Sequence, residues 1–561
     1  MCSSKCCSVF LQDGVLSLVC LSLALLPGCG GAPTGSTQES GGNTNSNSNS
    51  VTQLRVGKTA VWTHHNDNFR SGLNLTETAL TPANVAPASF GKLAAFSVQG
   101  YVYAQPLYVP NVSMTGDRIS NLLIVATEHD QLYAFDVDSK SVAWHVDYLA
   151  SGPNVSTLTP DDVVGCNDIV PEIGITGTPV IDTLSNTVYV LVRTKEVVGG
   201  VTAFYQRLHA VSLSTGEESL PPTVVTGPPP GYAGTGTAAF DPALNNQRAA
   251  LLLANNQVYI AWASHCDVGP YVGWLMSFDK ATLLPTAYWT PVPYSSAGGI
   301  WLSGGGPSVD ENGDIYLPVG NGNGADVIGV NGNYGNSFVR LQWSATNGFS
   351  VVDYFTPFNY QMMDDEDWDF GSGSAVLLPY QKGEPHSHLI VVRDKSGLLY
   401  VLDRDNLGQW HPNDNNQAVQ TFDGWGNGLS TPLFWNDTVY VAGGGAELAA
   451  FTFDPATQQF NPVAQSYLSY SLDSRGSTPS LSANGNRNAI LWMITDYKNG
   501  KRAVLHAVDP SNVANEFYNS SMMPDRDTAG AGVKFVVPTV ADGLVFVGAQ
   551  NEVDMYGLLP Q

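Results

Sequence analysis

Apolar and polar residues alternate in short segments along most of the chain, and turns rich in Gly, Asn and Asp separate these segments. Alternation with a period of two is typical of β-strands that bury one face. Sustained helical periodicity is nearly absent from the sequence. The pattern therefore predicts an all-β protein built from many short strands.

A strand phrase that begins with proline or alanine recurs through the chain. Its copies are PLYV at 106, PVID at 179, ALLL at 250, PSVD at 307, AVLL at 375, PLFW at 432, PSLS at 479 and PTVA at 538. A later phrase in each unit alternates apolar and aromatic residues, namely LYAFD at 132, LHAVS at 208, LMSFD at 275, FVRLQ at 338, LYVLD at 399, LAAFT at 448, LHAVD at 505 and VDMYG at 553. Repetition of such units indicates an eight-bladed β-propeller with four-stranded antiparallel blades.

The last unit lacks a fourth strand after Gly557. Residues 92–98, KLAAFSV, have a strand-like pattern and precede the first repeat. If this segment pairs into the last blade, the ring closes and no open strand edge remains. We therefore expect one propeller over residues 90–561, closed by this N-terminal strand, and we expect residues 58–89 to wrap around its outside.

The first residues have the composition of an export signal. Lys5 precedes an apolar run at residues 15–26, which is too short for an ordinary membrane-spanning helix. The run ends in Leu-Pro-Gly-Cys, which resembles the bacterial lipobox, and the resemblance implies that Cys29 is lipidated. The sequence thus predicts a lipoprotein signal peptide (1–28), a flexible Gly/Ser/Asn tether (29–57) and an exported protein anchored to a bacterial membrane, in the periplasm or at the cell surface. A plain signal peptide with a chance cysteine is the alternative.

Charge and cysteine content narrow the choice of partners. The formal net charge is −25 and the pI is about 4.5, so we expect no nucleic-acid partner. Cys166 and Cys266 are the only cysteines after Cys29, and such a pair in an exported protein favours a disulfide over two free buried thiols. The sequence contains no CxxCH motif for covalent haem.

Blade topology predicts which residues surround the central channel. In a four-stranded antiparallel blade, the entry to the first strand and the turn between the second and third strands lie on one face of the ring. We call this face the channel mouth. Its polar residues are expected to be Glu128, His129, Glu172, Arg193, His265, Asp369, Arg475 and Asp496.

The segment DDEDWDFGSGS at residues 364–374 crowds five carboxylates around one tryptophan. It falls at the entry to the fifth blade, so we expect it at the channel mouth, beside Lys395 and the turn at residues 321–323. Carboxylates at this density either raise one another's pKa or attract a cation such as Ca²⁺. Turn-forming and strand-capping carboxylates on a solvated loop are the simpler interpretation.

Several phrases resemble the pyrroloquinoline quinone (PQQ) propellers and, among them, the quinoprotein alcohol dehydrogenases. These phrases are FDVDSKSVAW at 135–144, SHCDVGPYVGWLMSFD at 264–279, IYLPVGNGNG at 315–324, DWDFGSGSAVLL at 367–378 and VVRDKSGLLYVLDRDNLG at 391–408. The resemblance implies that Asp267 and Asn323 are ligands of a quinone-bound Ca²⁺. It also implies a contact from Lys395 or Arg393 to the quinone oxygens, and it places Trp301 near the floor of the quinone site.

The chain also departs from the pattern of those dehydrogenases. They carry a catalytic aspartate after the asparagine turn, and here Asn336 stands near that place. An amide cannot accept the proton of an alcohol, so general-base catalysis fails at this position. The vicinal cysteine pair beside the quinone is absent, and GGGPSV at 304–309 lacks the floor tryptophan, with Trp301 only nearby.

We therefore expect a membrane-anchored, non-catalytic binding or scaffold protein with a degenerate quinone site. In layout it is similar to the lipidated eight-bladed propeller of outer-membrane assembly machinery, which implies a protein partner. One alternative is a quinoprotein dehydrogenase, a PQQ- and Ca²⁺-dependent oxidoreductase of alcohols or sugars. A second is a propeller that binds carbohydrate or peptide at the channel mouth, with Trp301, Trp368 and Trp425 as stacking platforms.

Overall fold

The computed structural model describes residues 57–228, 238–323, 328, 329, 331–495 and 500–560. The chain divides into two compact units, Met1–Val51 and Thr52–Gln561, and every described residue belongs to the second. The predicted signal peptide, Cys29, nearly all of the tether and Asp496 lie outside the described residues. None of the helices in the described ranges is long and apolar enough to cross a membrane.

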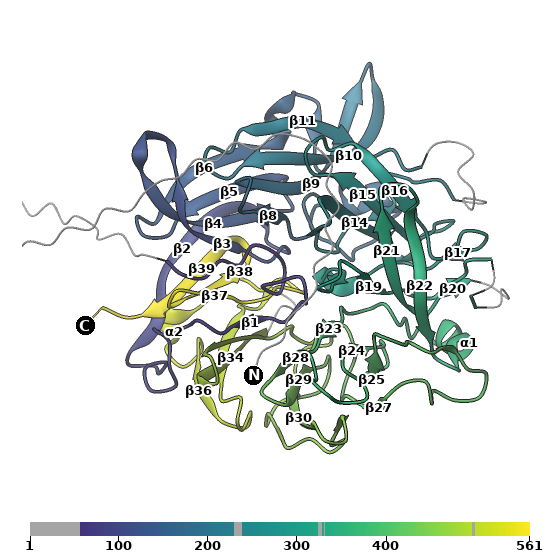
Figure 1. Ribbon diagram of the computed structural model, residues 1–561. Helices are drawn as coiled ribbons and strands as arrows, with labels where there is room; N and C mark the ends of the chain where they lie inside the picture. The colour runs from purple at the N-terminus through teal and green to yellow at the C-terminus, as the bar shows by residue number, and fades with distance from the viewer. Residues whose placement is uncertain (1–56, 229–237, 324–327, 330, 496–499, 561) are drawn as a thin grey trace, which may run out of the picture. The chain divides into compact units, whose positions relative to one another are not determined.

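Eight sheets, each built on four antiparallel strands and five of them with one short added strand, follow one another around a ring (Figure 1). Blade one contains β3 (Leu107–Ser113), β4 (Ile119–Thr127), β5 (Gln131–Asp136) and β6 (Ser141–Asp147). Blade two contains β8 (Val180–Asp182), β9 (Thr187–Val198), β10 (Val201–Ser212) and β11 (Glu218–Val224), with β7 (Val155–Ser156) added to β9. Blade three contains β13 (Leu252–Ala254), β14 (Gln257–Ser264), β15 (Trp274–Asp279) and β16 (Pro285–Trp289), with β12 (Asn245–Asn246) added to β14.

The remaining blades repeat this order. Blade four contains β18 (Ser308–Val309), β19 (Ile315–Pro318), β21 (Phe338–Ser344) and β22 (Gly348–Thr356), with β26 (Gln409–Trp410) added to β22. Blade five contains β23 (Val376–Leu377), β24 (Leu389–Arg393), β25 (Leu398–Asp403) and β27 (Gln420–Asp423). Blade six contains β28 (Leu433–Trp435), β29 (Thr438–Ala442), β30 (Leu448–Asp454) and β31 (Gln459–Phe460), with β32 (Ser466–Tyr467) added to β30.

Blade seven contains β33 (Ser480–Asn484), β34 (Arg487–Thr495), β35 (Val504–Val508) and β36 (Glu516–Asn519), with β1 (Leu73–Asn74) added to β33. Blade eight contains β37 (Thr539–Ala541), β38 (Leu544–Gly548) and β39 (Gln550–Leu558), together with β2 (Phe90–Tyr101) from before the first blade. Short elements elsewhere are β17 (Ser296–Ala297), which pairs with β20 (Gly322–Asn323), and the helices α1 (Tyr360–Asp365) and α2 (Pro524–Asp527).

The repeated sequence phrases correspond to equivalent strands. The proline and alanine phrases form the first strands of the eight blades, and the apolar-aromatic phrases form the third strands, so the predicted eight-bladed all-β fold is confirmed. The first strands lie nearest the centre of the ring (Figure 1). Because each blade is covered on both faces by its neighbours, almost every residue of β4 and β14 is buried.

The ring closes through an N-terminal strand, as the sequence predicts. β2 pairs antiparallel with β39, from Phe90 opposite Leu558 to Ser97 opposite Glu552, and is the fourth strand of blade eight. An ion pair between Lys92 Nζ and Asp554 Oδ1, 2.6 Å apart, joins the same two strands. This pairing covers the edge that β39 would otherwise leave open and completes blade eight with a fourth strand.

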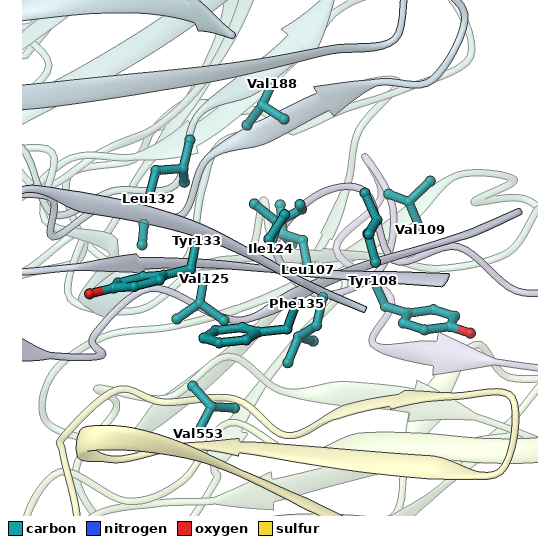
Figure 2. Close-up of a cluster of buried hydrophobic side chains, with 14 of the residues drawn as sticks. Leu107, Tyr108, Val109, Ile124, Val125, Leu132, Tyr133, Phe135, Val188 and Val553 are labelled. Carbon is teal, nitrogen blue, oxygen red and sulfur yellow. The ribbon is translucent and has the colours of Figure 1, made fainter. Parts of the chain in front are cut away.

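The apolar core lies between the blades. In the cluster shown in Figure 2, Leu107, Ile124 and Phe135 of blade one lie near Val188 of blade two and Val553 of blade eight. All of these side chains are almost fully buried. Since each blade buries its apolar faces against the next, burial stabilises the ring as a unit.

Residues 57–77, which we call the channel segment, run along the first strands of the blades, inside the ring. Val61 bridges Tyr108, and β1 pairs in parallel with β33. Between these points, backbone N–H groups of Ile181, Val309 and Leu377 donate to the carbonyls of Trp62, Asn68 and Phe69. The expectation that residues 58–89 wrap the outside of the propeller is therefore wrong for this part. The segment has little regular structure, so its place depends on tertiary hydrogen bonds that no sequence pattern reveals.

Polar groups of the channel segment find partners inside the ring. Arg70 is fully buried, and its guanidinium donates to Pro307 O at 3.0 Å, Thr63 Oγ1 at 2.8 Å and His64 O at 2.9 Å. The ring nitrogens of His65 bond the carbonyl oxygens of Arg70 and Pro479. Such bonds offset the cost of burying polar groups, so the segment is an integral part of the propeller.

The channel segment enters and leaves the ring at one face. The backbone N–H groups of Lys58 and Thr59 donate to the Asp542 carboxylate, and Gly543 N donates to Glu77 Oε2. Asp542 and Gly543 form the turn between β37 and β38, the first and second strands of blade eight. That turn lies on the face opposite the predicted channel mouth.

Candidate functional site at the channel mouth

A cavity of about 140 Å³ lies at the channel mouth. Its walls come from the loops that enter the first strands and from turns that follow second strands. The residues that form it are Asp168, Arg248, Cys266, Asp267, Trp301, Asp369, Ser372, Lys395, Leu429 and Arg475. Since the channel segment occupies the ring from the opposite face, this cavity is reached from the mouth.

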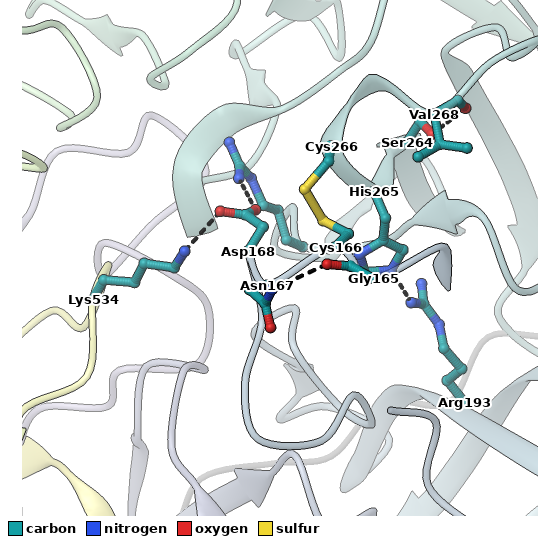
Figure 3. The surroundings of a disulfide bond; sticks show 11 residues. Gly165, Cys166, Asn167, Asp168, Arg193, Ser264, His265, Cys266, Val268 and Lys534 are labelled. Carbon is teal, nitrogen blue, oxygen red and sulfur yellow. Dashed lines mark hydrogen bonds and ion pairs between the residues drawn. A yellow bond between two sulfur atoms is a disulfide. The ribbon is translucent and has the colours of Figure 1, made fainter. Parts of the chain in front are cut away.

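A disulfide staples two loops of the mouth together. Cys166, in the loop before blade two, is bonded to Cys266, in the short 3₁₀ turn η4 (His265–Asp267) after β14, with the two Cα atoms 5.7 Å apart (Figure 3). The structure thus contains the pairing that the sequence favours. The bond is not the vicinal pair of the dehydrogenases, but its Cys266 half borders the cavity.

Three cations surround one carboxylate beside the disulfide. Asp168 Oδ2 lies 2.8 Å from Arg248 Nη1, and Asp168 Oδ1 lies 2.7 Å from Lys534 Nζ (Figure 3). Although burial acts in the opposite direction, Arg248, Lys534 and Arg475 hold the pKa of Asp168 well below its usual range. We call Asp168, Arg248, Arg475 and Lys534 the cationic group. It contains three positive charges and one carboxylate, so two positive charges are uncompensated.

Arg475 is the most available member of the cationic group. It is half-buried, and within the described ranges its guanidinium has neither a hydrogen-bond nor an ion-pair partner. Arg248 is buried, and its guanidinium lies 5.1 Å from the centre of the Trp301 ring. A free guanidinium on a cavity wall is suited to bind a carboxylate or another planar anion.

The acidic segment from the fifth blade entry forms the remaining wall. Lys395 Nζ lies 2.6 Å from Asp367 Oδ2 and 3.2 Å from Asp369 Oδ2, and Asn321 N donates to Asp369 Oδ1 at 2.9 Å. This confirms the predicted neighbourhood of the segment, Lys395 and the turn at 321–323. Burial raises the pKa of Asp369 to about 6, against the opposing attraction of Lys395. Asp267 accepts a hydrogen bond from Tyr271 Oη at 2.6 Å. We call Asp267, Asp367, Asp369 and Lys395 the acidic group.

Asn336 occupies a structural position next to this wall. Its Nδ2 donates to Asp364 Oδ1 at 2.7 Å, and its Oδ1 accepts from Phe370 N at 3.0 Å. Burial raises the pKa of Asp364 to about 7, and this carboxylate also accepts from Gly322 N. Asn336 therefore holds the acidic segment against the turn and offers no basic group.

The residues present do not fit a Ca²⁺–quinone pair in this arrangement. Among the described residues, no group of three or more Asp, Glu, His or Cys side chains is placed to hold a metal ion. The Lys395 ammonium already lies between Asp367 and Asp369 and is paired with both carboxylates. Arg248 covers Trp301, and the cavity is smaller than the roughly 300–1,000 Å³ usual for cofactor sites.

Other residues predicted for the channel mouth lie outside the cavity wall. Glu128, Arg193 and His265 are buried between the first three blades, and Arg193 Nη1 is 2.6 Å from His265 Nε2. His129 Nδ1 lies 2.8 Å from Glu172 Oε2 near the surface. Arg193 and His265 thus form a buried polar contact beside the disulfide, outside the cavity wall (Figure 3).

The remaining predicted residues are placed as follows. Arg393 is buried and donates to Trp425 O and Gly426 O, so Lys395 is the cation of this pair that reaches the cavity. Asn323 forms the end of β20 through its backbone, opposite Ser296. Of the three proposed stacking tryptophans, only Trp301 borders the cavity.

Sequence reasoning missed Asp168, Arg248 and Lys534. Each lies in a loop that enters a first strand, and Arg248 stands just before the ALLL phrase at 250. The topological rule that assigns such entries to the mouth applies to all of them. No motif singled them out, however, because their importance comes from contacts between distant loops.

Comparison with known proteins was informative only at the level of structure. Neither a protein-family model nor a curated protein sequence matches the chain. A quinohemoprotein alcohol dehydrogenase from Comamonas testosteroni has a TM-score of 0.58 at 14% identity, over 90% of this chain and 82% of that one. A quinohemoprotein alcohol dehydrogenase from Pseudomonas putida has a TM-score of 0.56 at 12% identity, over 89% of this chain and 80% of that one.

A europium-containing methanol dehydrogenase is similar as well, with a TM-score of 0.55 at 12% identity over 88% of this chain and 89% of that one. These likenesses show that the chain has the eight-bladed PQQ-type propeller fold of the quinoprotein alcohol dehydrogenases. At such low identity they concern the fold, and the site has to be judged from its own residues.

Proposed function

We propose that the protein is an exported, lipid-anchored propeller that binds a small zwitterion, such as an amino acid, at its channel mouth and does not itself oxidise alcohols. One observation carries this proposal. The cationic group (Asp168, Arg248, Arg475 and Lys534) and the acidic group (Asp267, Asp367, Asp369 and Lys395) have opposite excess charges, and all of their members except Lys534 and Asp367 line a single cavity.

The two groups suggest how such a ligand is oriented. Its carboxylate would pair with the Arg475 guanidinium, which is free within the described residues and presents a planar fork of donors. Its ammonium would pair with Asp267, whose exposed carboxylate has, among the residues that the structure describes, the Tyr271 hydroxyl as its one hydrogen-bond partner. A cavity of about 140 Å³ favours a ligand of few atoms.

The local chemistry argues against alcohol oxidation. Asn336 has no basic group, and its amide is engaged by Asp364 and Phe370. Asp364 has a pKa suited to proton transfer, but it does not border the cavity. The likeness to alcohol dehydrogenases keeps a PQQ-dependent oxidoreductase as the competing function, so the test has to include it.

Calorimetric titration of the full-length protein in detergent separates these functions. Glycine and L-alanine should bind more tightly than acetate or ethylammonium, each of which carries only one of the two charges. Arg475→Gln should weaken amino-acid binding by about tenfold, because it removes a charge-assisted contact. Arg487→Gln, at an exposed position on the opposite face, is the matched control and should bind like the wild type.

A second arm tests the competing function. PQQ with Ca²⁺ should produce no alcohol-dependent reduction of an artificial electron acceptor. Turnover that depends on both additions, and that Lys395→Ala abolishes, would establish the dehydrogenase instead. Equal binding of acetate and glycine would reduce the proposal to a simple anion site.

A further inference from the structure

A second cavity, of about 660 Å³, lies at the junction of blades one and two and shares no residue with the channel mouth. We call it the blade-two groove. Its walls include Tyr148 from η2 (Tyr148–Ser151), which follows β6, and Val192, Arg207, His209 and Glu218 from blade two. In Figure 1, β6 and β11, the outer strands of blades one and two, lie in neighbouring sheets near the rim of the ring. A volume of this size is typical of small-molecule sites.

The groove contains a Tyr–His–Glu arrangement. The rings of Tyr148 and His209 are 4.6 Å apart, and His209 Nδ1 lies 2.6 Å from Glu218 Oε1. Tyr148 is 8% exposed, yet its hydroxyl has no hydrogen-bond partner within the described chain. Burial raises its pKa, so the hydroxyl stays protonated and is an unsatisfied donor and acceptor.

The repeat supplies an internal comparison in blade seven. Tyr470 follows the outer strands of blade six as Tyr148 follows those of blade one, and His506 and Glu516 occupy the strand positions of His209 and Glu218. There the arrangement is closed: Tyr470 Oη lies 2.9 Å from His506 Nδ1, which is 2.5 Å from Glu516 Oε1. The fold can therefore satisfy this hydroxyl, but it does not do so at Tyr148.

A second group is left open in blade two. His506 Nε2 bonds Thr495 Oγ1 at 2.8 Å, and Thr495 lies two residues beyond Met493, which pairs with His506. In blade two His209 pairs with Val190, so the residue in the place of Thr495 is Val192. Valine has no hydroxyl, and His209 Nε2 has no partner among the described residues. Two neighbouring polar groups are thus free in the same groove.

Charge and polarity in the groove indicate the ligand. Arg207 is paired with Glu196 at 2.5 Å, so the groove wall offers no unpaired arginine or lysine to an anionic ligand. Groups that both donate and accept can satisfy Tyr148 Oη and His209 Nε2 together. Val146, Val155 and Pro222 add apolar wall, against which the C–H groups of a sugar ring can pack. We infer that the blade-two groove binds a neutral saccharide.

Titration of the full-length protein in detergent with maltotetraose, cellotetraose, xylotetraose and chitotetraose tests this inference. At least one should bind, and Tyr148→Phe should weaken it by about five- to tenfold through loss of one hydroxyl. Tyr470→Phe is the matched control and should leave binding unchanged.

The outcome does not depend on the proposed amino-acid site, since Arg475→Gln should leave saccharide binding unaltered. No binding of any of the four tetrasaccharides at millimolar concentration would overturn the inference. Equal binding by wild type and Tyr148→Phe, with unchanged unfolding transitions, would overturn it as well.

Discussion

Lys92 Nζ lies 2.6 Å from the Asp554 carboxylate, across the pairing of β2 with β39. Asp554 is fully buried, and its second oxygen accepts from Gly530 N at 2.7 Å. The two residues stand at opposite ends of the propeller sequence, and their contact closes the ring. The seam between first and last strand is therefore held by a charge pair as well as by backbone hydrogen bonds.

Lys92→Met should lower the free energy of unfolding by about 3–5 kcal/mol, because it leaves the Asp554 charge buried without its partner. Urea unfolding measures the loss. The double variant Lys92→Met/Asp554→Asn should regain most of it, since no buried charge remains and the asparagine oxygen still accepts from Gly530. A double variant no more stable than the single one would contradict the role of the pair.

Gly72→Ala tests whether the channel segment is part of the fold. Gly72 has a φ of 70°, and an added Cβ would lie 2.2 Å from His65 Nε2. We expect a loss of about 3 kcal/mol or more in the free energy of unfolding. Gly116 has a similar φ of 73° with nothing within 4 Å, so Gly116→Ala should cost only about 1 kcal/mol. Equal losses would mean that the segment is loosely held.

Replacing both Cys166 and Cys266 by serine should lower stability. The bond closes a sequence separation of 100 residues, so the entropic model predicts a loss of about 4–5 kcal/mol. Thermal or urea unfolding with and without reductant provides the measurement. Peptide mapping of the wild type under non-reducing conditions should recover the two cysteines in one linked species; recovery as two free thiols would refute the pairing.

Stability should decrease as the pH rises from 5 to 8. Burial raises the pKa of Glu128 from about 4.5 to about 7, so between these values the folded state holds a proton that the unfolded state has lost. That proton contributes about 3 kcal/mol at low pH, and the contribution disappears as the pH passes 7. Glu128→Gln should make the pH dependence shallower, with the remaining slope due to Asp364 and Asp369, whereas Glu217→Gln in an exposed turn should leave it unchanged.

Cys29 should be the lipidated residue of the mature protein. Metabolic labelling with a clickable palmitate should mark the wild type and leave Cys29→Ala unlabelled. The Cys29→Ala protein should also be released from the membrane fraction. Equal labelling of the two proteins would remove the lipid anchor from the proposed function.

The acidic segment at 364–374 illustrates what sequence reasoning reached at the site. Its place at the mouth, beside Lys395 and the turn at 321–323, followed from blade topology and is confirmed by the contacts of Asp369. The free groups of Tyr148 and His209 were not recognised. They become visible only when their contacts are compared with those of Tyr470 and His506 in blade seven.

The sequence by itself determined the eight blades, the strand that closes them and the face on which the channel mouth lies. These properties depend on local alternation and on the order of strands in each repeat, and both are written in consecutive residues. Tertiary structure alone placed the channel segment inside the ring and gathered the cationic group. Asp168 lies 80 residues from Arg248 and 366 from Lys534, and the ring brings them within hydrogen-bond distance. Charge pairing across such separations depends on how loops from different blades meet, which no local pattern encodes.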